Sequence, residues 1–205
     1  MNEELIARAM AQSLPPAILK QAIHSYEEDK FDECIGYCEA IIANKDASDK
    51  VRATAMYLLG DVYLDLERFE QADALFDSLV ALDKSDVAFA NRGFSLFCQR
   101  KWPAALENYF EATRLNPKNW VAVGFTAECL VQLGQPERAI KLLVEAAGNG
   151  ADHPKVFRIL GASYSKQEKW IDAYGAFYKA LSMDPDDEFS KNAIEAIERL
   201  ANDES

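Results

Sequence analysis

Hydrophobic and small residues recur along most of the chain at spacings of three and four positions. Such spacing places side chains on one face of an α-helix. One face of this kind consists of Met56, Leu59, Gly60 and Tyr63. A second, further along the chain, consists of Ala72, Phe76 and Leu79. Alternation of the kind expected for β-strands is hard to find, so the pattern predicts pairs of amphipathic helices and an all-α fold.

The same pattern returns at intervals of 33 or 34 residues. A small residue in the first helix of each pair recurs at Gly60, Gly93, Ala127 and Gly161. An alanine in the second helix recurs at Ala72, Ala105, Ala139 and Ala173. An earlier, weaker copy has Ala22, Cys34, Cys38 and Ile41 in the same register, with about four extra residues near 44–50. Because one helix pair cannot bury its own apolar face, we expect successive pairs to stack.

This register resembles the tetratricopeptide repeat, a helix–turn–helix unit of 34 residues. The best matches are Leu59-Gly60-Asp61-Val62-Tyr63 with Ala72 and Phe76, and Leu160-Gly161-Ala162-Ser163-Tyr164 with Ala173 and Phe177. The resemblance implies a right-handed α-solenoid of five copies, at 15–52, 53–85, 86–119, 120–153 and 154–187. We expect a leading helix within 1–14 and a capping helix with a short tail at 188–205.

The two flanking helices are predicted from their own apolar stripes. The leading stripe consists of Leu5, Ile6, Ala9 and Met10, and the capping stripe of Phe189, Ala193, Ile197 and Leu200. A capping helix covers the open end of a stack of repeats. The leading helix has three possible roles: it could cap the stack, pair two molecules into a homodimer, or occupy the groove of its own chain.

Charge and composition narrow the function classes. The 205 residues include 34 acidic and 22 basic side chains, which gives a formal net charge of −12. Since nucleic-acid binding needs clustered cations, we expect no nucleic-acid partner. The apolar runs are too short to cross a bilayer and the N-terminus has no signal-peptide pattern. We therefore expect no membrane insertion, a cytoplasmic location and reduced thiols.

Residues that could support catalysis or metal binding are scattered. The two histidines, His24 and His153, lie in different copies, and no serine or cysteine partner stands at a fixed spacing from either. Cys34 and Cys38 share a helix face, but further metal ligands are not grouped near them. We therefore expect no catalytic residues, no metal and no cofactor. The alternative from another class is an enzyme with an unrecognised site.

The first helices of a repeat stack line one concave surface, at positions opposite their buried positions. In this chain those positions are largely apolar and aromatic, and become basic in the last copy. The predicted groove residues are Tyr57, Asp61, Leu64, Val87, Phe94, Phe97, Val121, Glu128, Val131, Lys155 and Arg158. A large apolar groove is typical of a partner site. We expect a non-catalytic module that binds a segment of another protein there, and a Phe94/Phe97 double alanine variant that binds more weakly without unfolding.

Two narrower resemblances bear on the partner. Some members of the family bind acidic C-terminal tails through a clamp of Lys, Asn and Arg, but here only Asn91 matches one clamp position. A local stretch, Ala127-Glu128-Cys129-Leu130 with Gly134 and Ala139, is similar to the third repeat of type III secretion chaperones for translocator proteins. That similarity implies, as an alternative, an assembly chaperone for an aggregation-prone cargo.

Overall fold

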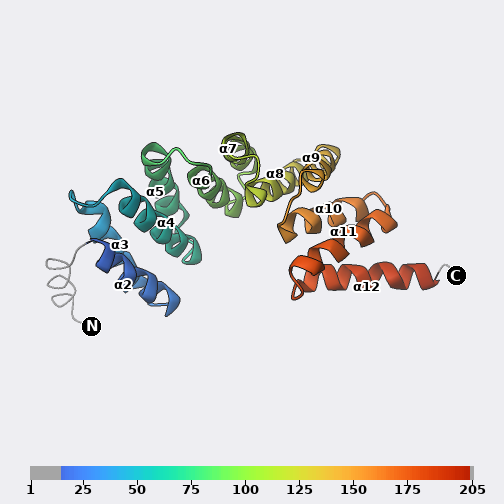
Figure 1. Cartoon of the computed structure of the whole chain (residues 1–205), viewed down its shortest axis with the longest axis horizontal. Helices are drawn as coiled ribbons and strands as arrows, with labels where there is room; N and C mark the ends of the chain where they lie inside the picture. Colours follow the sequence, from blue (N-terminus) through green and yellow to red (C-terminus); the bar gives the residue numbers. More distant parts are fainter. Residues whose placement is uncertain (1–14, 204–205) are drawn as a thin grey trace. The chain divides into compact units, whose positions relative to one another are not determined.

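The computed structural model describes residues 15–203, and within this range it contains helices and no strand. The helices are α2 (Pro15–Glu27), α3 (Phe31–Ala43), α4 (Asp49–Asp65), α5 (Phe69–Leu82), α6 (Asp86–Cys98), α7 (Trp102–Leu115), α8 (Trp120–Gln132), α9 (Pro136–Gly148), α10 (Pro154–Ser165), α11 (Trp170–Met183) and α12 (Glu188–Asp203). They follow one another as helix–turn–helix pairs, with α12 last (Figure 1). The leading helix predicted at 3–13 lies outside the described residues.

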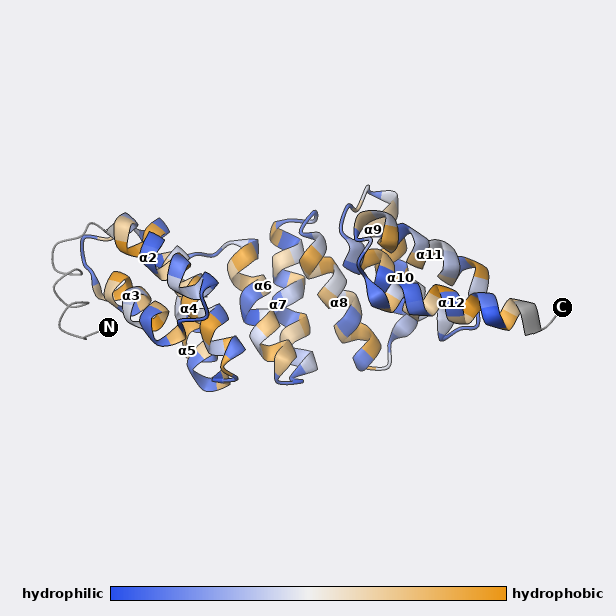
Figure 2. Ribbon diagram, turned by 90° about the horizontal axis from the view of Figure 1, so that it is seen from below, coloured by the Kyte–Doolittle hydropathy of each residue, from blue (hydrophilic) through white to orange (hydrophobic). Residues whose placement is uncertain are grey.

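The predicted repeat columns form the core. The first-helix residues Gly60, Gly93, Ala127 and Gly161 are all buried, as are the second-helix residues Ala72, Ala105, Ala139 and Ala173. In Figure 2, hydrophobic and hydrophilic stretches alternate along the helices, as expected where each helix buries one face. The all-α, stacked-pair fold predicted from the periodicity is confirmed.

A close approach between paired helices explains why the first-helix column holds small residues. A Cβ atom on Gly60 would lie 2.3 Å from Cζ of Phe76, and one on Gly161 would lie 2.7 Å from Cδ1 of Phe177. Real Cβ contacts essentially never fall below 3.0 Å. Each aromatic ring therefore rests directly on the backbone of the facing helix, and only glycine fits at these two positions.

The turns within the five pairs repeat one backbone geometry. A single residue with positive φ lies in each turn, and these residues are Asp29, Glu67, Arg100, Gly134 and Glu168. The next N–H donates to a carbonyl five positions back, as from Gln135 to Leu130 at 2.8 Å. This is the Schellman ending of a helix, which usually places glycine at the positive-φ position. Here only Gly134 provides it, so four turns hold a residue that strongly prefers negative φ.

We expect Gly134→Ala to lower the free energy of unfolding by about 1 kcal/mol, because its φ of +73° is unfavourable for a residue with a Cβ. Gly148 is the matched control: it is the last residue of α9, and nothing lies within 4 Å of an added Cβ. Gly148→Ala should be neutral or stabilising by about 0.5 kcal/mol. Urea unfolding of both variants measures the difference, and equal stabilities would contradict the turn argument.

The extra residues between the first two copies lengthen a helix. α4 begins at Asp49, four residues before the predicted copy boundary at Ala53, and contains 17 residues. The side chain of Ser48 caps it by accepting from the N–H of Val51 at 3.4 Å. Arg52 donates to the carbonyls of Asn44 and Ala47 at 3.3 and 3.1 Å, which ties the preceding turn to the helix. The added residues thus extend the first turn of α4.

The described residues form two compact units, and the boundary between them lies inside α6, between Ser95 and Leu96. The first unit has its own core, with Phe76 and Ile41 fully buried. The second has a separate core, with Leu143 and Phe177 buried among neighbouring helices.

The helix α12 packs on α11 through Ala193 and Ile197 in the middle of its predicted stripe, and the ring centroid of Phe189 lies 5.9 Å from that of Phe177. Ile197 is buried and Ala193 is half-buried. Phe189 and Leu200, at the two ends of the stripe, remain 54% and 46% exposed. The helix α12 thus lies at the predicted capping position and leaves apolar surface exposed near both of its ends.

Candidate functional site

The predicted groove residues divide between the two units. Tyr57, Asp61, Leu64, Val87 and Phe94 belong to the first unit. Phe97, Val121, Glu128, Val131, Lys155 and Arg158 belong to the second. All eleven are half-buried or exposed, and three of them, Tyr57, Leu64 and Val131, also pack against the core of their unit. Each unit therefore presents its own part of the predicted first-helix face.

In the first unit, this face combines tyrosines with carboxylates. The hydroxyl of Tyr57 donates to Oδ2 of Asp83 at 2.9 Å, and that of Tyr26 donates to Oδ2 of Asp65 at 2.9 Å. Asp61 lies half-buried one helical turn before Asp65. Burial, together with the negative charge of Asp65, raises the pKa of Asp61 to about 6. The face is thus acidic, and one of its carboxylates is held in an unfavourable environment.

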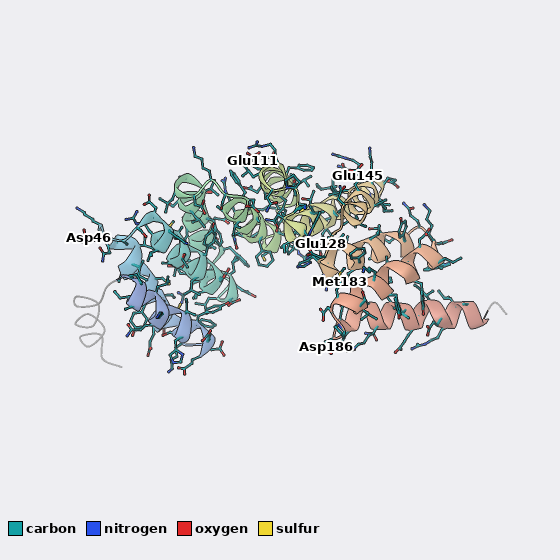
Figure 3. All side chains as sticks on the ribbon, viewed as in Figure 1. Asp46, Glu111, Glu128, Glu145, Met183 and Asp186 are labelled. Carbon is teal, nitrogen blue, oxygen red and sulfur yellow. The ribbon has the colours of Figure 1, made fainter. Side chains whose placement is uncertain are left out.

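In the second unit, Glu128 and Lys155 form an ion pair across α8 and α10. Nζ of Lys155 lies 2.9 Å from Oε2 of Glu128 and 3.5 Å from the centroid of the Phe125 ring. Glu128 projects from α8 in Figure 3. Burial lowers the pKa of Lys155, although Glu128 opposes that shift. These two predicted groove residues therefore neutralise each other instead of offering free charges.

Arg158, one helical turn further along α10, is held more loosely. Its Nη1 lies 3.8 Å from Oδ1 of the buried Asp187. Asp187 is fixed by the hydroxyl of Ser190, which donates to its Oδ2 at 2.6 Å. Because 3.8 Å is beyond hydrogen-bond distance, the guanidinium of Arg158 keeps donors available for another acceptor.

A cavity of about 380 Å³ lies between α8, α10 and α12, in the second unit. Its walls are Glu128, Val131, Gln132, Arg158, Ile159, Ala162, Ser163, Lys166 and Phe189. Three of the predicted groove residues, Glu128, Val131 and Arg158, thus meet at one place. A smaller cavity of about 190 Å³ adjoins Arg158 on the side of His153 and Asp187. The larger one combines apolar walls with cationic side chains and is the candidate site.

Phe97 has a different environment from the one predicted. Its ring centroid lies 4.8 Å from that of Trp102 and 5.1 Å from that of Phe125, and Phe125 stacks on the buried Tyr109. Phe97 thus supports the packing of α7 and α8. A Phe97→Ala change would disturb that packing, so the Phe94/Phe97 double variant cannot separate binding from stability.

Six walls of the larger cavity were not predicted as groove residues: Gln132, Ile159, Ala162, Ser163, Lys166 and Phe189. Phe189 is predicted as part of the apolar stripe of the capping helix, and its exposed ring also forms a wall of the larger cavity. His153, for which the sequence indicates no catalytic partner, has a structural role: its Nδ1 accepts from the N–H of Lys155 at 3.2 Å and caps α10. Burial lowers the pKa of His153, which keeps Nδ1 able to accept. The sequence His153-Pro154, a polar residue followed by a first-turn proline, is the signal that could have indicated this cap.

The cysteines that were considered as possible metal ligands, Cys34 and Cys38, lie in the core of the first unit. Cys34, Cys38 and Cys129 are buried free thiols, and burial raises the pKa of Cys129 to about 12. Within residues 15–203, no three histidine, cysteine or acidic side chains lie close enough together to hold a metal ion. Among the same residues, no helix is long and apolar enough to span a bilayer.

Known proteins resemble this chain in sequence and fold. Models of the tetratricopeptide repeat match residues 53–86 and 96–162. A human protein, protein O-mannosyl-transferase TMTC1, is 27% identical over 133 residues, or 65% of this chain. This chain spans only 15% of the length of that relative, so the likeness concerns one stretch of a much longer protein.

Solved structures share the fold at low sequence identity. TTC0263, a thermophilic tetratricopeptide repeat protein of Thermus thermophilus, has a TM-score of 0.69 at 18% identity, over 90% of this chain and 98% of that one. YrrB, described as a repeat protein with an unusual peptide-binding site, has a TM-score of 0.64 at 19% identity, over 93% and 97%. MamA of Desulfovibrio magneticus RS-1 reaches 0.67 at 15% identity, over 85% and 97%.

The fold of these repeats is that of a protein–protein interaction module. The 34-residue register, the buried columns, the repeated turn geometry and the two matched stretches agree with one another. Together they show that this chain belongs to the tetratricopeptide repeat family.

Proposed function

We propose that this chain is a non-catalytic interaction module that holds a segment of a partner protein against its first helices, with the cavity between α8, α10 and α12 as the main contact. The observation that carries the proposal is the convergence of Val131, Ile159, Ala162 and Phe189 with Arg158 and Lys166 around one open cavity. Pockets that combine apolar walls with a few charged groups are typical binding sites. The peptide-binding site that YrrB is described as having supports a peptide as the ligand class.

The wall chemistry favours a segment that presents an apolar side chain next to a carboxylate. The apolar walls would bury the first, and Arg158 would bind the second, because its only described acceptor is 3.8 Å away. The local cationic character is unusual in a chain with a formal net charge of −12. Electrostatic complementarity of this kind contributes to specificity and to the rate of association.

Two valines of nearly equal exposure allow a matched test. Val121 on α8 is 42% exposed and belongs to the predicted groove, whereas Val144 on α9 is 45% exposed and lies on a second helix. We expect Val121→Glu to weaken capture of a partner from native lysate at least tenfold, and Val144→Glu to leave it unchanged. Both substitutions add the same charge, so a partner lost with both variants, or with neither, would exclude the first-helix face.

The role of Arg158 is tested once a partner has been captured. Arg158→Gln should weaken that partner about tenfold, since a charge-assisted hydrogen bond is lost. Arg138→Gln, on the exposed face of α9, is the control and should have no effect. Unchanged affinity with Arg158→Gln would mean that the partner presents no carboxylate to Arg158. The folding of each variant is checked by circular dichroism.

The captured partner also bears on the alternatives from the sequence. An assembly chaperone would hold a cargo that is insoluble alone and stable when co-expressed, whereas a scaffold would hold a partner that is stable by itself. A cytoplasmic location and a possible homodimer through the leading helix stay predictions from the sequence alone. The first is tested by fractionation and the second by the mass in solution.

A further inference from the structure

A second cavity, of about 620 Å³, lies between α11 and α12, away from the first-helix face. Its walls are Glu168, Trp170, Ile171, Tyr174, Ile197, Glu198, Leu200 and Ala201. Three of these apolar side chains are open to solvent, with Trp170 39%, Ile171 90% and Leu200 46% exposed. We call this cavity the α11/α12 cleft. Large apolar side chains gathered on an open surface are typical of an interaction site.

Comparison with the other repeats shows that Ile171 is exceptional. Two positions before the second-helix alanine, the other four copies have Asp32, Glu70, Pro103 and Glu137, all of them exposed. Acidic residues suit this position, because it lies in the first turn of a helix. The repeat therefore requires no apolar side chain there. In the last copy, an isoleucine replaces the acid and is almost fully exposed, so a contact outside the described residues explains it best.

The rim of the cleft is acidic. Glu168 and Glu198 lie among its walls, and the hydroxyl of Tyr174 donates to Oε1 of Glu198 at 3.2 Å. An occupant should therefore present apolar side chains with a cation beside them. It should also be short, because 620 Å³ is within the range of pockets that enclose a few side chains.

Residues 1–14 of the chain combine an apolar stripe with one cation, Arg8, and two acidic residues, Glu3 and Glu4. They lie outside the described residues, and their sequence places Leu5, Ile6, Ala9 and Met10 on one face of a predicted helix. Arg8 flanks this stripe and is the cation that could meet Glu168 or Glu198. In stacked repeats each copy contacts only its neighbours. Since residues 1–14 precede the first copy and the cleft belongs to the fifth, we assign the occupant to another molecule.

We propose that the α11/α12 cleft binds residues 1–14 of a second copy of this chain. The contact joins the N-terminal segment of one molecule to α11 and α12 of the next. Such a heterologous interface leads to concentration-dependent assemblies larger than a dimer, unless the ring closes. It involves neither the cavity at Arg158 nor the rest of the first-helix face, so it can fail while the proposed partner binding holds.

Complementation between two full-length variants tests this arrangement. Ile171→Glu disables the cleft and keeps the segment, whereas Ile6→Glu disables the segment and keeps the cleft. We expect the wild-type chain to self-associate beyond a dimer at about 100 µM, a weak-contact concentration. Each variant alone should sediment as a monomer, and an equimolar mixture of the two should form a dimer and nothing larger. Val144→Glu, on the outside of α9, should assemble like the wild type.

Each contrary result overturns the proposal in a recognisable way. A wild-type chain that stays monomeric over the whole concentration range would exclude a second copy in the cleft. The same result would be obtained if residues 1–14 bound the cleft of their own chain, and it would overturn the proposal in that case too. Self-association of Ile6→Glu would mean that another surface fills the cleft. A mixture that stays monomeric would mean that the two mutated surfaces do not contact each other. Circular dichroism of each variant confirms that the helices are intact.

Discussion

Gly60→Ala should lower the free energy of unfolding by about 2 kcal/mol, within the range of roughly 1–3 kcal/mol that overpacking a core usually costs. The added Cβ would lie 2.3 and 2.5 Å from Cζ and Cε1 of Phe76, whose side chain is fully buried. The ring cannot yield without moving α5 away from α4. This loss outweighs the gain of roughly 0.5–1 kcal/mol that alanine brings to a helix interior.

Gly36 supplies the matched control, because it also lies inside a helix of the first unit and nothing lies within 4 Å of an added Cβ. Gly36→Ala should raise the free energy of unfolding by roughly 0.5–1 kcal/mol. Urea unfolding of both variants gives the comparison. Equal stabilities would mean that the Phe76 ring does not rest on Gly60. In the double variant Gly60→Ala/Phe76→Leu, the smaller side chain should make the two changes less costly than their sum.

The same contact in the second unit should be weaker. A Cβ on Gly161 would lie 2.7 to 2.9 Å from three atoms of the Phe177 ring, a smaller overlap than at Gly60. Gly161→Ala should therefore cost less than Gly60→Ala. Gly175→Ala, with open space around its Cβ, is the corresponding control. The reverse order of the two losses would indicate that the rings differ in how far they can shift.

The repeat register made these contacts predictable. Once Gly60 and Phe76 recur as Gly161 and Phe177 at whole multiples of the repeat, helical geometry places the small residue and the ring on facing sides of one pair. The buried columns follow from that arithmetic alone. The start of α4 at Asp49 was harder to predict, because it depends on whether the extra residues join the helix or the turn. The cap by Ser48 decides this locally.

The sequence predicted which face of the first helices carries the candidate site, but not the side-chain contacts on that face. Repeat positions predict Val131 and Arg158 as groove residues, but they do not indicate which neighbours these side chains meet. Lys155 and Glu128 were both predicted as groove residues, and their ion pair depends on how closely α8 and α10 approach. Phe97 has a groove position in the register, but its ring packs against Trp102 and Phe125 instead. Side-chain direction of this kind is set by packing, which spacing does not specify.

Asp61→Asn should raise the free energy of unfolding at pH 7–8 by about 1–2 kcal/mol. The pKa of Asp61 is raised from 3.8 to about 6, first by burial and then by the charge of Asp65. Below pH 3.8 this carboxyl is protonated in both the folded and the unfolded state, and its contribution to the free energy of unfolding is then at its maximum. That contribution is lost as the pH rises through about 6. The expected gain is smaller than the full shift implies, because solvent screens a half-buried site.

The pH dependence distinguishes this effect from a general change in charge. The advantage of Asp61→Asn should disappear as the pH falls from 7 to below 4, whereas Asp46→Asn removes the same charge from an exposed turn and should change little at any pH. Chemical unfolding at four or five pH values provides the curve, and a gain that does not depend on pH would mean that Asp61 is not desolvated.

Groups with perturbed pKa values are often found at functional sites, and we expect a partner contact at Asp61 because it lies on the predicted groove. A cation from the partner would stabilise the charged form of Asp61 and would remove the penalty on binding. Asp61→Asn should then be more stable than the wild type at pH 7 and also bind the captured partner less tightly. If the partner binds both forms equally, the charge of Asp61 contributes nothing to that contact, and the partner would be held by the second unit.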